Sequence, residues 1–414
     1  MGDYGRFATV DELVFTEGSG PLERYPGGFA DQCFNAVARA DIQIFLGRIA
    51  TTTLRCISGD GLQGAVHWVV AARQLRMLRI AIPTGAKIRD LELALRGLQL
   101  QSPRTLQQLE IQLERTFSTQ ELDILVHILA NLCLALPSLT TLIAPLDALE
   151  VAGGPRVVPT RVHGLQTLIA THRLSTGILQ RSTVCSLHLP LLRTLHISAP
   201  FDLSASVAAT LPCIEELAIT CDSPNGIEES LHRISIACQR LISVYLNVGG
   251  SLQQRYNVNW RPLLHCWKME RFQIIYPYTL PFIRTDLEEM LSRWQYINRL
   301  SLNPSPRDAS QQPALPLSSL AAVAESAPKL LHLEAFMDCH GTAKLSVPRS
   351  WDSLLELQLG SSQGDSADIP SIASSILRIF PNVTLLTEHC SPWVQQLGRE
   401  VQSRKGMNLG WIHH

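Results

Sequence analysis

Long apolar stretches are missing from this chain of 414 residues. The best run, Leu125 to Leu136, is interrupted by His127 and Asn131, whereas a membrane span needs ~18 or more predominantly apolar residues without such breaks. The first residues, MGDYGRFATVDEL, contain neither a basic leader nor the apolar core of a secretory signal. We therefore expect an intracellular protein, located in the cytoplasm or the nucleus.

A dominant charge of either sign is also missing. The formal net charge is -1 at pH 7, and lysine is rare, with Lys87, Lys268, Lys329, Lys344 and Lys405 as its only positions. Proteins that bind nucleic acid or anionic membranes usually carry a marked basic excess. The composition therefore predicts no nucleic-acid partner and no membrane partner.

The chain also lacks the spacings typical of disulfide frameworks and zinc sites. Ten cysteines without a secretory leader indicate reduced thiols, and several of them stand where a small apolar residue fits the pattern described below. No CxxC or HxxxH spacing accompanies the adjacent pairs His265-Cys266, Cys339-His340 and His389-Cys390. We expect no metal and no other cofactor.

Catalytic signatures are absent, with one motif that resembles a cofactor site. There is no GxSxG, HExxH or phosphate-loop pattern, so we expect no enzymatic activity. SGDGLQG matches GxGxxG at Gly59, Gly61 and Gly64, between a predicted strand and a predicted helix, as in a dinucleotide-binding turn. The acidic residue that would bind the ribose is replaced by Ile82 and Pro83. A dinucleotide-binding protein stays an alternative, and it requires a reversal of strand order at this turn.

What the chain does contain is a repeated apolar pattern. Between Leu192 and Ile219 the template LxxLxL occurs twice, as LRTLHI and IEELAI, separated by a linker of small residues. Alternating burial predicts a short strand in each copy, and the linker predicts a helix that returns the chain. From Leu54 onward the central residue recurs every 22 to 33 residues, and it is found at Leu13, Leu54, Leu78, Leu109, Leu142, Leu168, Leu195, Leu217, Val244, Phe272, Leu300, Leu333, Leu357 and Leu386.

This period predicts an α/β leucine-rich-repeat solenoid, a horseshoe with a parallel concave sheet and outer helices. Four junctions place proline two residues before the first apolar residue of a strand, where it ends a helix and favours extended backbone: Pro137, Pro212, Pro328 and Pro381. We expect residues 1–53 to form an irregular first repeat and a helix at 29–49. Residues 54–412 are expected to form one continuous solenoid domain.

Helix boundaries are also predicted. Ser118 with Glu121 and Thr285 with Glu288 have the spacing of capping boxes, and a further helix is expected from Trp393 onward. The last residues, MNLGWIHH, are expected to form a closing strand.

The junction PxLxxLxL, the irregular period and the ending VQQLGREVQSRKGMNLGWI resemble the leucine-rich-repeat part of fungal F-box-type proteins, especially those of mushroom-forming fungi, over about residues 50–412. The resemblance implies a receptor that presents a protein substrate to a ubiquitin ligase. No F-box with its LPxEI-like start is found, so a ligase adaptor is an expected partner only if another N-terminal docking motif exists. We expect the N-terminus to be truncated relative to such proteins.

A second departure concerns the position five residues after the central one, where many leucine-rich repeats carry Asn or Cys that bonds the turn backbone. Here it holds Pro83, Glu114, Asp147, Pro200, Asp222, Gly249, Pro277 and Ser305, so this ladder is not expected.

The expected binding surface follows from the repeat register. Residues directly before and after each central position point onto the concave face. Arg and aromatic side chains are frequent anchors of protein interfaces, which selects Tyr245, Arg271, Arg299, His332 and the nearby Phe336 as a contiguous patch. We expect a scaffold that binds an unidentified protein partner there. A structural remnant without a partner stays a further alternative.

Overall fold

The computed structural model of the chain contains two compact units, Met1–Ser198 and Ala199–His414. The structure describes residues 13–15, 51–56, 75–82, 88–101, 104–113, 119–144, 160–161, 164–170, 187–188, 191–198, 213–221, 227–249, 258–308, 312–340 and 350–409. The predicted helix at 29–49 and the glycine motif at Gly59, Gly61 and Gly64 lie outside these residues. The predicted boundary at residue 54 stays a prediction.

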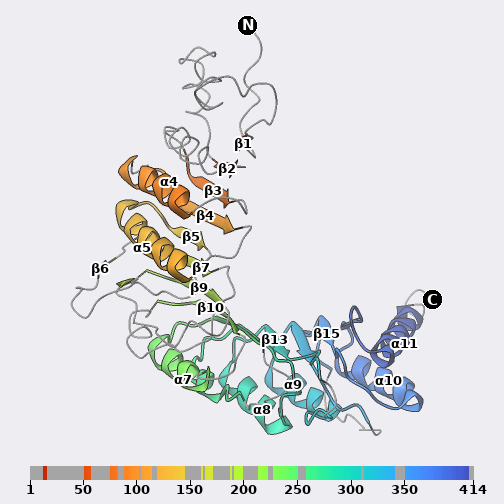
Figure 1. The fold of residues 1–414 in the computed structure, drawn as a ribbon. Coiled ribbons are helices and arrows are strands. Elements are labelled where there is room, and N and C mark those ends of the chain that lie inside the picture. The colour runs from red at the N-terminus through yellow and green to blue at the C-terminus, as the bar shows by residue number, and fades with distance from the viewer. Residues whose placement is uncertain are drawn as a thin grey trace, which may run out of the picture. The chain divides into compact units, whose positions relative to one another are not determined.

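The first unit contains a parallel sheet whose strands are neighbours in chain order (Figure 1). Its strands are β1 (Leu13–Phe15), β2 (Thr51–Cys56), β3 (Met77–Ile82), β4 (Gln108–Leu113), β5 (Thr141–Ala144), β7 (Thr167–Ala170) and β9 (Thr194–Ser198). Helices α4 (Ile88–Gln101) and α5 (Thr119–Ala135) pack against each other on one side of it. A separate parallel pair is formed by β6 (Thr160–Arg161) and β8 (Leu187–His188).

The second unit repeats this plan. Its parallel strands, again in chain order, are β10 (Glu216–Cys221), β11 (Ser243–Val248), β12 (Arg271–Ile275), β13 (Arg299–Leu302), β14 (His332–Ala335), β15 (Glu356–Gln358) and β16 (Thr384–Leu386). The α-helices between or after them are α7 (Ile227–Ala237), α8 (Arg284–Arg293), α9 (Leu320–Ser326), α10 (Ile369–Ile379) and α11 (Pro392–Leu409). Shorter 3-10 helices are η3 (Arg261–His265), η4 (Leu317–Ser319) and η5 (Ser366–Asp368).

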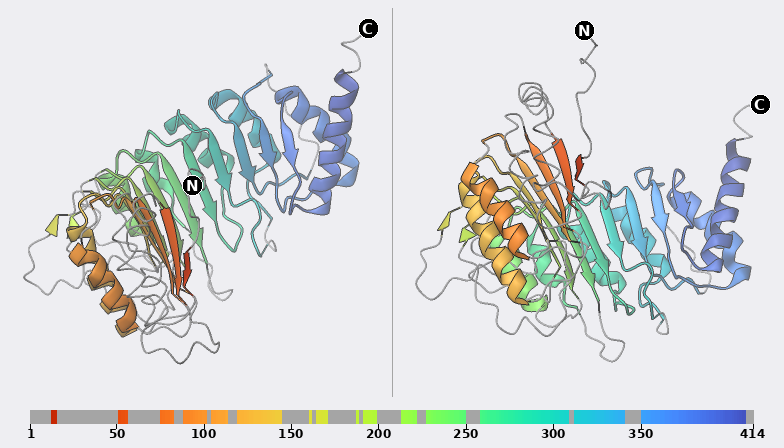
Figure 2. Two further views of the ribbon diagram at one scale, coloured as in Figure 1. Left: turned by 90° about the horizontal axis from the view of Figure 1, so that it is seen from above. Right: turned by 45° about the horizontal axis from the view of Figure 1, so that its top comes forward.

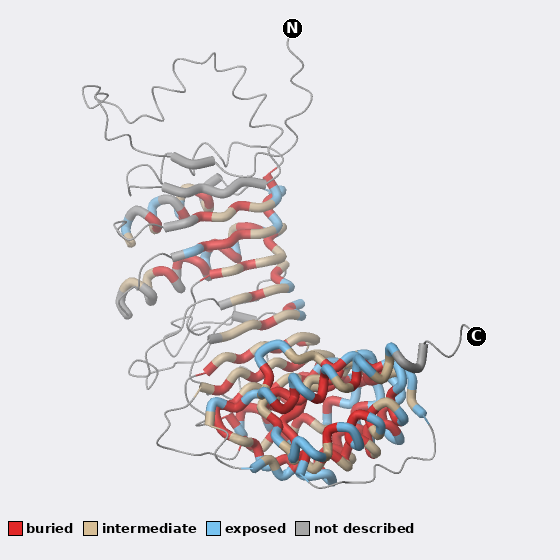
Figure 3. Tube along the Cα trace, turned by 90° about the vertical axis from the view of Figure 1, so that its right-hand side faces the viewer, coloured by how far each residue is buried: buried red, intermediate tan, exposed pale blue. Residues whose placement is uncertain are grey.

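The core of each unit lies between its sheet and its helices. In β10 and β11 every second residue is buried, as alternation on a sheet with one covered face requires. Helices α7 to α10 lie along the same side of the second sheet (Figure 2), and buried residues recur along both its strands and its helices (Figure 3). The predicted α/β leucine-rich-repeat solenoid, with parallel strands and helices on one side, is confirmed.

Strand pairing corrects the predicted register at β2 and β16. Between β10 and β15 the central residues pair as predicted, for example Leu217 with Val244. In β2, however, Thr52 and not Leu54 pairs with Leu78, a shift of two residues. In β16, Leu357 pairs with Leu385 and not with Leu386, and this shift of one residue exchanges the two faces of the strand.

Buried polar side chains hold the turns that follow two of the strands. Asn303 accepts a hydrogen bond from the Tyr276 N–H and donates one to the Tyr278 carbonyl of the preceding repeat. Ser362, five residues after the central Leu357, accepts a hydrogen bond from the Met337 N–H. In many leucine-rich repeats a ladder of Asn or Cys bonds the turn backbone, and this sequence has no such ladder. Asn303 and Ser362 bond the backbone locally instead.

Two predicted helix features also differ from the structure. Helix α8 begins at Arg284, and Asp286 accepts a hydrogen bond from the Ile283 N–H, so the cap lies two residues before the predicted Thr285–Glu288 pair. Helix α11 continues to Leu409, so Met407 to Leu409 are helical and not part of a closing strand. Within the described ranges, no helix is long and apolar enough to cross a membrane.

Candidate functional site

Four of the five predicted partner-binding residues lie on one surface of the second unit. We call this surface the sheet face: the side of strands β10 to β15 turned away from α7, α8, α9 and α10. Strand pairing aligns it into two rows, because residues that pair across a parallel sheet share one face. The first row is Glu216, Ser243, Arg271, Arg299, His332 and Glu356, and the second is Ala218, Tyr245, Gln273, Ser301, Glu334 and Gln358.

Each cationic residue of the predicted patch contacts an acid on this face. Arg271 Nη2 lies 2.5 Å from Glu216 Oε1, and its side chain passes the small Ser243 on the intervening strand to reach it. Arg299 Nη2 lies 2.9 Å from Glu334 Oε1, one strand away. Positive and negative side chains therefore form ion pairs across the sheet face, and neither sign of charge dominates it.

His332 and Ser301 extend this network. The Nδ1 atom of His332 lies 2.7 Å from Glu356 Oε2 on the next strand. The Ser301 hydroxyl donates a hydrogen bond of 2.7 Å to Glu334 Oε2, so Glu334 is held from two sides. Neighbouring strands of a sheet are ~4.8 Å apart, which lets side chains of this length meet across one strand.

Tyr245 is half-buried on β11, where it pairs with Ala218 on one side and Gln273 on the other. The short Ala218 leaves one flank of the ring uncovered by a long side chain. Tyrosine in such a place offers a rigid apolar surface with a polar tip, which suits a protein interface.

Phe336 lies apart from these four residues. It follows β14, and its side chain is only 9% exposed, so it is part of the core. The sequence analysis predicted Phe336 near the patch because it comes soon after His332, but it follows the last residue of β14 and is buried. A buried ring offers a partner almost no contact area.

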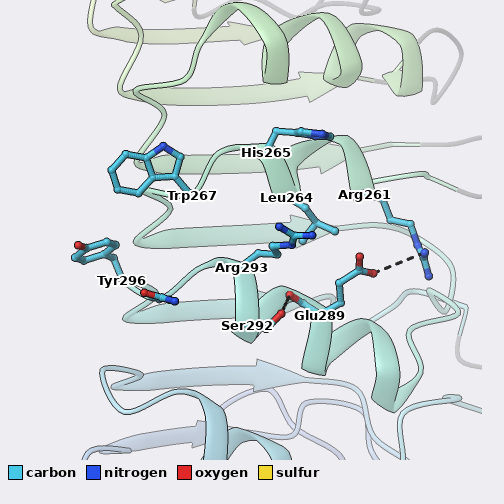
Figure 4. A pocket seen from close by; sticks show the side chains of 9 residues that line it. Arg261, Leu264, His265, Trp267, Glu289, Ser292, Arg293 and Tyr296 are labelled. Atoms are coloured by element: carbon cyan, nitrogen blue, oxygen red, sulfur yellow. Dashed lines mark hydrogen bonds and ion pairs between the residues drawn. The ribbon is translucent and has the colours of Figure 1, made fainter.

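A second surface, which the sequence analysis did not identify, lies where helices end and strands begin. A groove of about 650 Å³ is lined by residues of η3, α8 and the turns after them: Arg261, Leu264, His265, Trp267, Glu289, Ser292, Arg293, Gln295 and Tyr296. Figure 4 shows Trp267 and Tyr296 at one end and Arg261 facing Glu289 at the other, with Arg293 between them. We call this space the helix groove.

Beside the helix groove, two lysines stack on its aromatic residues. Lys268 Nζ lies 5.0 Å from the centroid of the Trp267 ring, and Lys329 Nζ lies 4.2 Å from that of Tyr296. The two rings lie 6.4 Å apart, so these four residues form one cluster across three repeats. We call it the turn cluster. Its signal in the sequence is the position three residues before β11, β12, β13 and β14, which holds Arg240, Lys268, Tyr296 and Lys329.

Cys133, Cys238, Cys266 and Cys339 are buried as apolar core residues. Burial raises the pKa of the Cys266 thiol to about 12, and nearby Cys238, whose own pKa is raised to about 12 by burial, adds to the effect. Among the residues that the structure describes, no three His, Cys, Asp or Glu side chains come together as a metal site would require.

The strand order bears on the dinucleotide alternative. Strand β2 pairs with β1 on one side and with β3 on the other, in chain order and in parallel. Strand order is therefore not reversed at β2. The reversal that the dinucleotide-binding alternative predicted there is wrong.

No protein-family profile matches this chain, and no curated protein matches it. Among solved structures, it is similar to a glycosylated form of the Drosophila Toll–Spatzle complex, with 13% identity and a TM-score of 0.40 over 91% of this chain and 46% of the other. A second structure of that complex shows 12% identity and a TM-score of 0.30 over 83% of this chain and 55% of the other. The chain thus spans about half the length of the solved chains it matches.

Proposed function

We propose that this chain is a non-enzymatic scaffold that binds a protein partner on its sheet face. The observation that carries the proposal is the alignment of charged and aromatic side chains, at the same register, across adjacent strands β10 to β15. A protein partner is favoured over a small ligand because the rows form an extended surface, whereas small ligands are usually enclosed in a cavity.

The ion pairs of the sheet face favour this function in a specific way. Arg271 and Arg299 are already held by Glu216 and Glu334, so fewer rotamers are lost when a partner binds. Both arginines stay about half exposed, which leaves N–H groups available to a partner. We infer that the partner's surface is polar and of mixed charge, with an apolar contact for Tyr245.

The test compares two double variants. Tyr245→Ala with Arg271→Ala removes two neighbouring anchors of the sheet face. Ile236→Ala with Arg399→Ala removes an exposed apolar residue and an exposed arginine from α7 and α11. Partners are captured from a fungal lysate, the source implied by the resemblance, and their affinities are then measured with purified protein. We expect the first variant to weaken binding about thirtyfold, the effect of ~2 kcal/mol, and the second to bind like wild type.

Equal binding by both variants would exclude the sheet face as the binding surface. Capture of no partner at all would favour the structural remnant. Because Tyr245 and Arg271 are both partly exposed, we expect their loss to change the free energy of unfolding by less than about 1 kcal/mol. Circular dichroism therefore separates a binding defect from a folding defect.

The finer proposal concerns a ubiquitin ligase. The resemblance to fungal F-box-type proteins would make the partner a substrate and would require a ligase adaptor in the same complex, inside the cell. The capture experiment asks for this adaptor directly. A partner found together with the adaptor would support a receptor that docks through another motif, whereas a partner without the adaptor would support an independent scaffold.

A further inference from the structure

The helix groove and the turn cluster differ from the sheet face in how many of their cations form ion pairs with acidic side chains. Arg261 lies 2.7 Å from Asp286 and 3.7 Å from Glu289, so two carboxylates face its single positive charge. Arg293, Lys268 and Lys329 are exposed, and no acid among the described residues forms an ion pair with them. This edge of the unit therefore has a local excess of positive charge in a chain whose net charge is -1.

Apolar surface is exposed at the same place. The Trp267 and Tyr296 side chains are 52% and 43% exposed, although both are large rings that proteins usually cover. Each ring contacts a lysine on one side, and Figure 4 shows both rings at the end of the helix groove opposite Arg261. Exposed rings beside uncompensated cations are typical of a surface that a ligand covers.

We propose that the helix groove and turn cluster form a second binding site, which takes an acidic peptide segment of another protein. Carboxylates of the segment would pair with Arg293, Lys268 and Lys329, and an apolar or aromatic side chain would pack on Trp267 and Tyr296. A groove between η3 and α8 with a volume of about 650 Å³ has room for a few side chains of such a segment.

Charge complementarity selects this occupant over nucleic acid. Glu289 lies within the groove and would repel a phosphate backbone, whereas a peptide can place a polar residue beside it. Three uncompensated cations would release few counterions from a nucleic acid and would give only weak binding. A peptide gains from the same cations and, in addition, from the apolar surface of the rings.

The test uses a displayed library of random peptides about twelve residues long, selected on the full wild-type chain. Peptides enriched on wild type are then measured on Arg293→Glu and on Trp267→Ala by fluorescence anisotropy. Arg399→Glu on α11 is the matched charge control, since it reverses another exposed arginine away from the groove. Tyr245→Ala with Arg271→Ala shows whether the sheet face contributes.

We expect the enriched peptides to contain an excess of Asp and Glu together with aromatic or large apolar residues. Arg293→Glu should weaken their binding at least about tenfold, and Trp267→Ala by a similar factor, whereas Arg399→Glu and the sheet-face variant should bind like wild type. Raising the salt concentration should weaken binding further, because the site is partly exposed.

Several outcomes would overturn the proposal. They are the absence of any enriched peptide, enrichment of basic or uncharged peptides, and equal binding to Arg293→Glu. Binding of oligothymidine in preference to the acidic peptides would assign the surface to single-stranded nucleic acid instead. Since Arg293 and Trp267 are both exposed, their variants are expected to fold, and circular dichroism checks this.

Discussion

Two surfaces of the second unit arise from the same repeats but differ in what their positive side chains contact. On the sheet face, Arg271 and Arg299 each contact an acid that arises from a strand. At the turn cluster, Lys268 and Lys329 instead contact the rings of Trp267 and Tyr296. The first surface is electrically balanced and the second is positive.

The difference follows from where each surface lies in the repeat. Parallel strands ~4.8 Å apart bring long side chains of successive repeats together, so a charge on one strand meets its complement on the next or the one after. The turns before the strands expose short loops, where the side chains have fewer neighbours. One leucine-rich-repeat unit therefore presents two surfaces of different chemistry over a shared core.

The largest expected effect comes from the core residue that connects β12 to η3. Trp294 is fully buried, its ring centroid lies 5.1 Å from that of Phe272, and its Nε1 donates a hydrogen bond to the Leu263 carbonyl. Trp294→Ala should lower the free energy of unfolding by about 3–5 kcal/mol and impair both surfaces. Trp267→Ala is the matched control, and it should cost less than about 1 kcal/mol because Trp267 is exposed. Urea unfolding measures both. Equal losses of unfolding free energy would contradict the placement of Trp294 in the core and of Trp267 on the surface.

A smaller effect is expected at the turn after β13. Asn303 has a φ of 49°, in the left-handed region, and forms hydrogen bonds with the backbone of Tyr276 and Tyr278. Asn303→Ala would lose these bonds and strain the backbone, and it should cost about 2–4 kcal/mol in urea unfolding. Asn303→Gly keeps the backbone conformation and loses only the hydrogen bonds, so it should cost less. If glycine costs more than alanine, the backbone does not have this conformation.

The stability of the core should also depend on pH through a buried thiol. Burial raises the pKa of Cys266 from 9.0 to about 12. The folded state therefore favours the neutral thiol, so this contribution to stability is complete below pH 9.0 and is lost as the pH rises towards about 12. We expect the decrease in unfolding free energy between about pH 8 and about pH 10.5 to be smaller in Cys266→Ala than in wild type. An identical decrease would show that Cys266 is not buried.

The smallest effect on stability is expected when an arginine of the sheet face loses its acidic partner, so that it lacks an ion pair like the lysines of the turn cluster. Glu334→Gln removes the carboxylate that holds Arg299 and Ser301. Since Arg299 is about half exposed, the loss in unfolding free energy should be below about 1 kcal/mol. The change should be seen instead in the affinity for the captured partner. A loss of several kcal/mol in stability would mean that the pair is structural and not part of a binding surface.

Much of the fold could be predicted from the sequence because the repeat pattern is redundant. The central residues Leu217, Val244, Phe272 and Leu300 were each identified by a simple apolar template, and strand pairing confirms all of them. The template failed where two neighbouring residues satisfy it equally, as at Leu385 and Leu386. It also failed at Leu54, which pairs with Ile80 and not with Leu78.

The sheet face was predictable for the same reason, whereas the rest of the surface was not. Alternation alone placed Tyr245, Arg271, Arg299 and His332 on one side of the sheet. Phe336 lies beyond the end of β14, where alternation no longer fixes the side-chain direction, and it is buried. The helix groove combines residues of η3, α8 and two turns, and its geometry depends on helix packing that no sequence period describes.

The most direct test of the proposed function is site-specific photo-crosslinking. A benzophenone amino acid replaces Tyr245 on the sheet face in one protein and Tyr296 at the turn cluster in another, and each is irradiated with the captured partner. If the sheet face binds this partner, the crosslink forms from position 245 and not from position 296. A crosslink from position 296 alone, or equal crosslinking from both, would contradict the assignment of the partner to the sheet face.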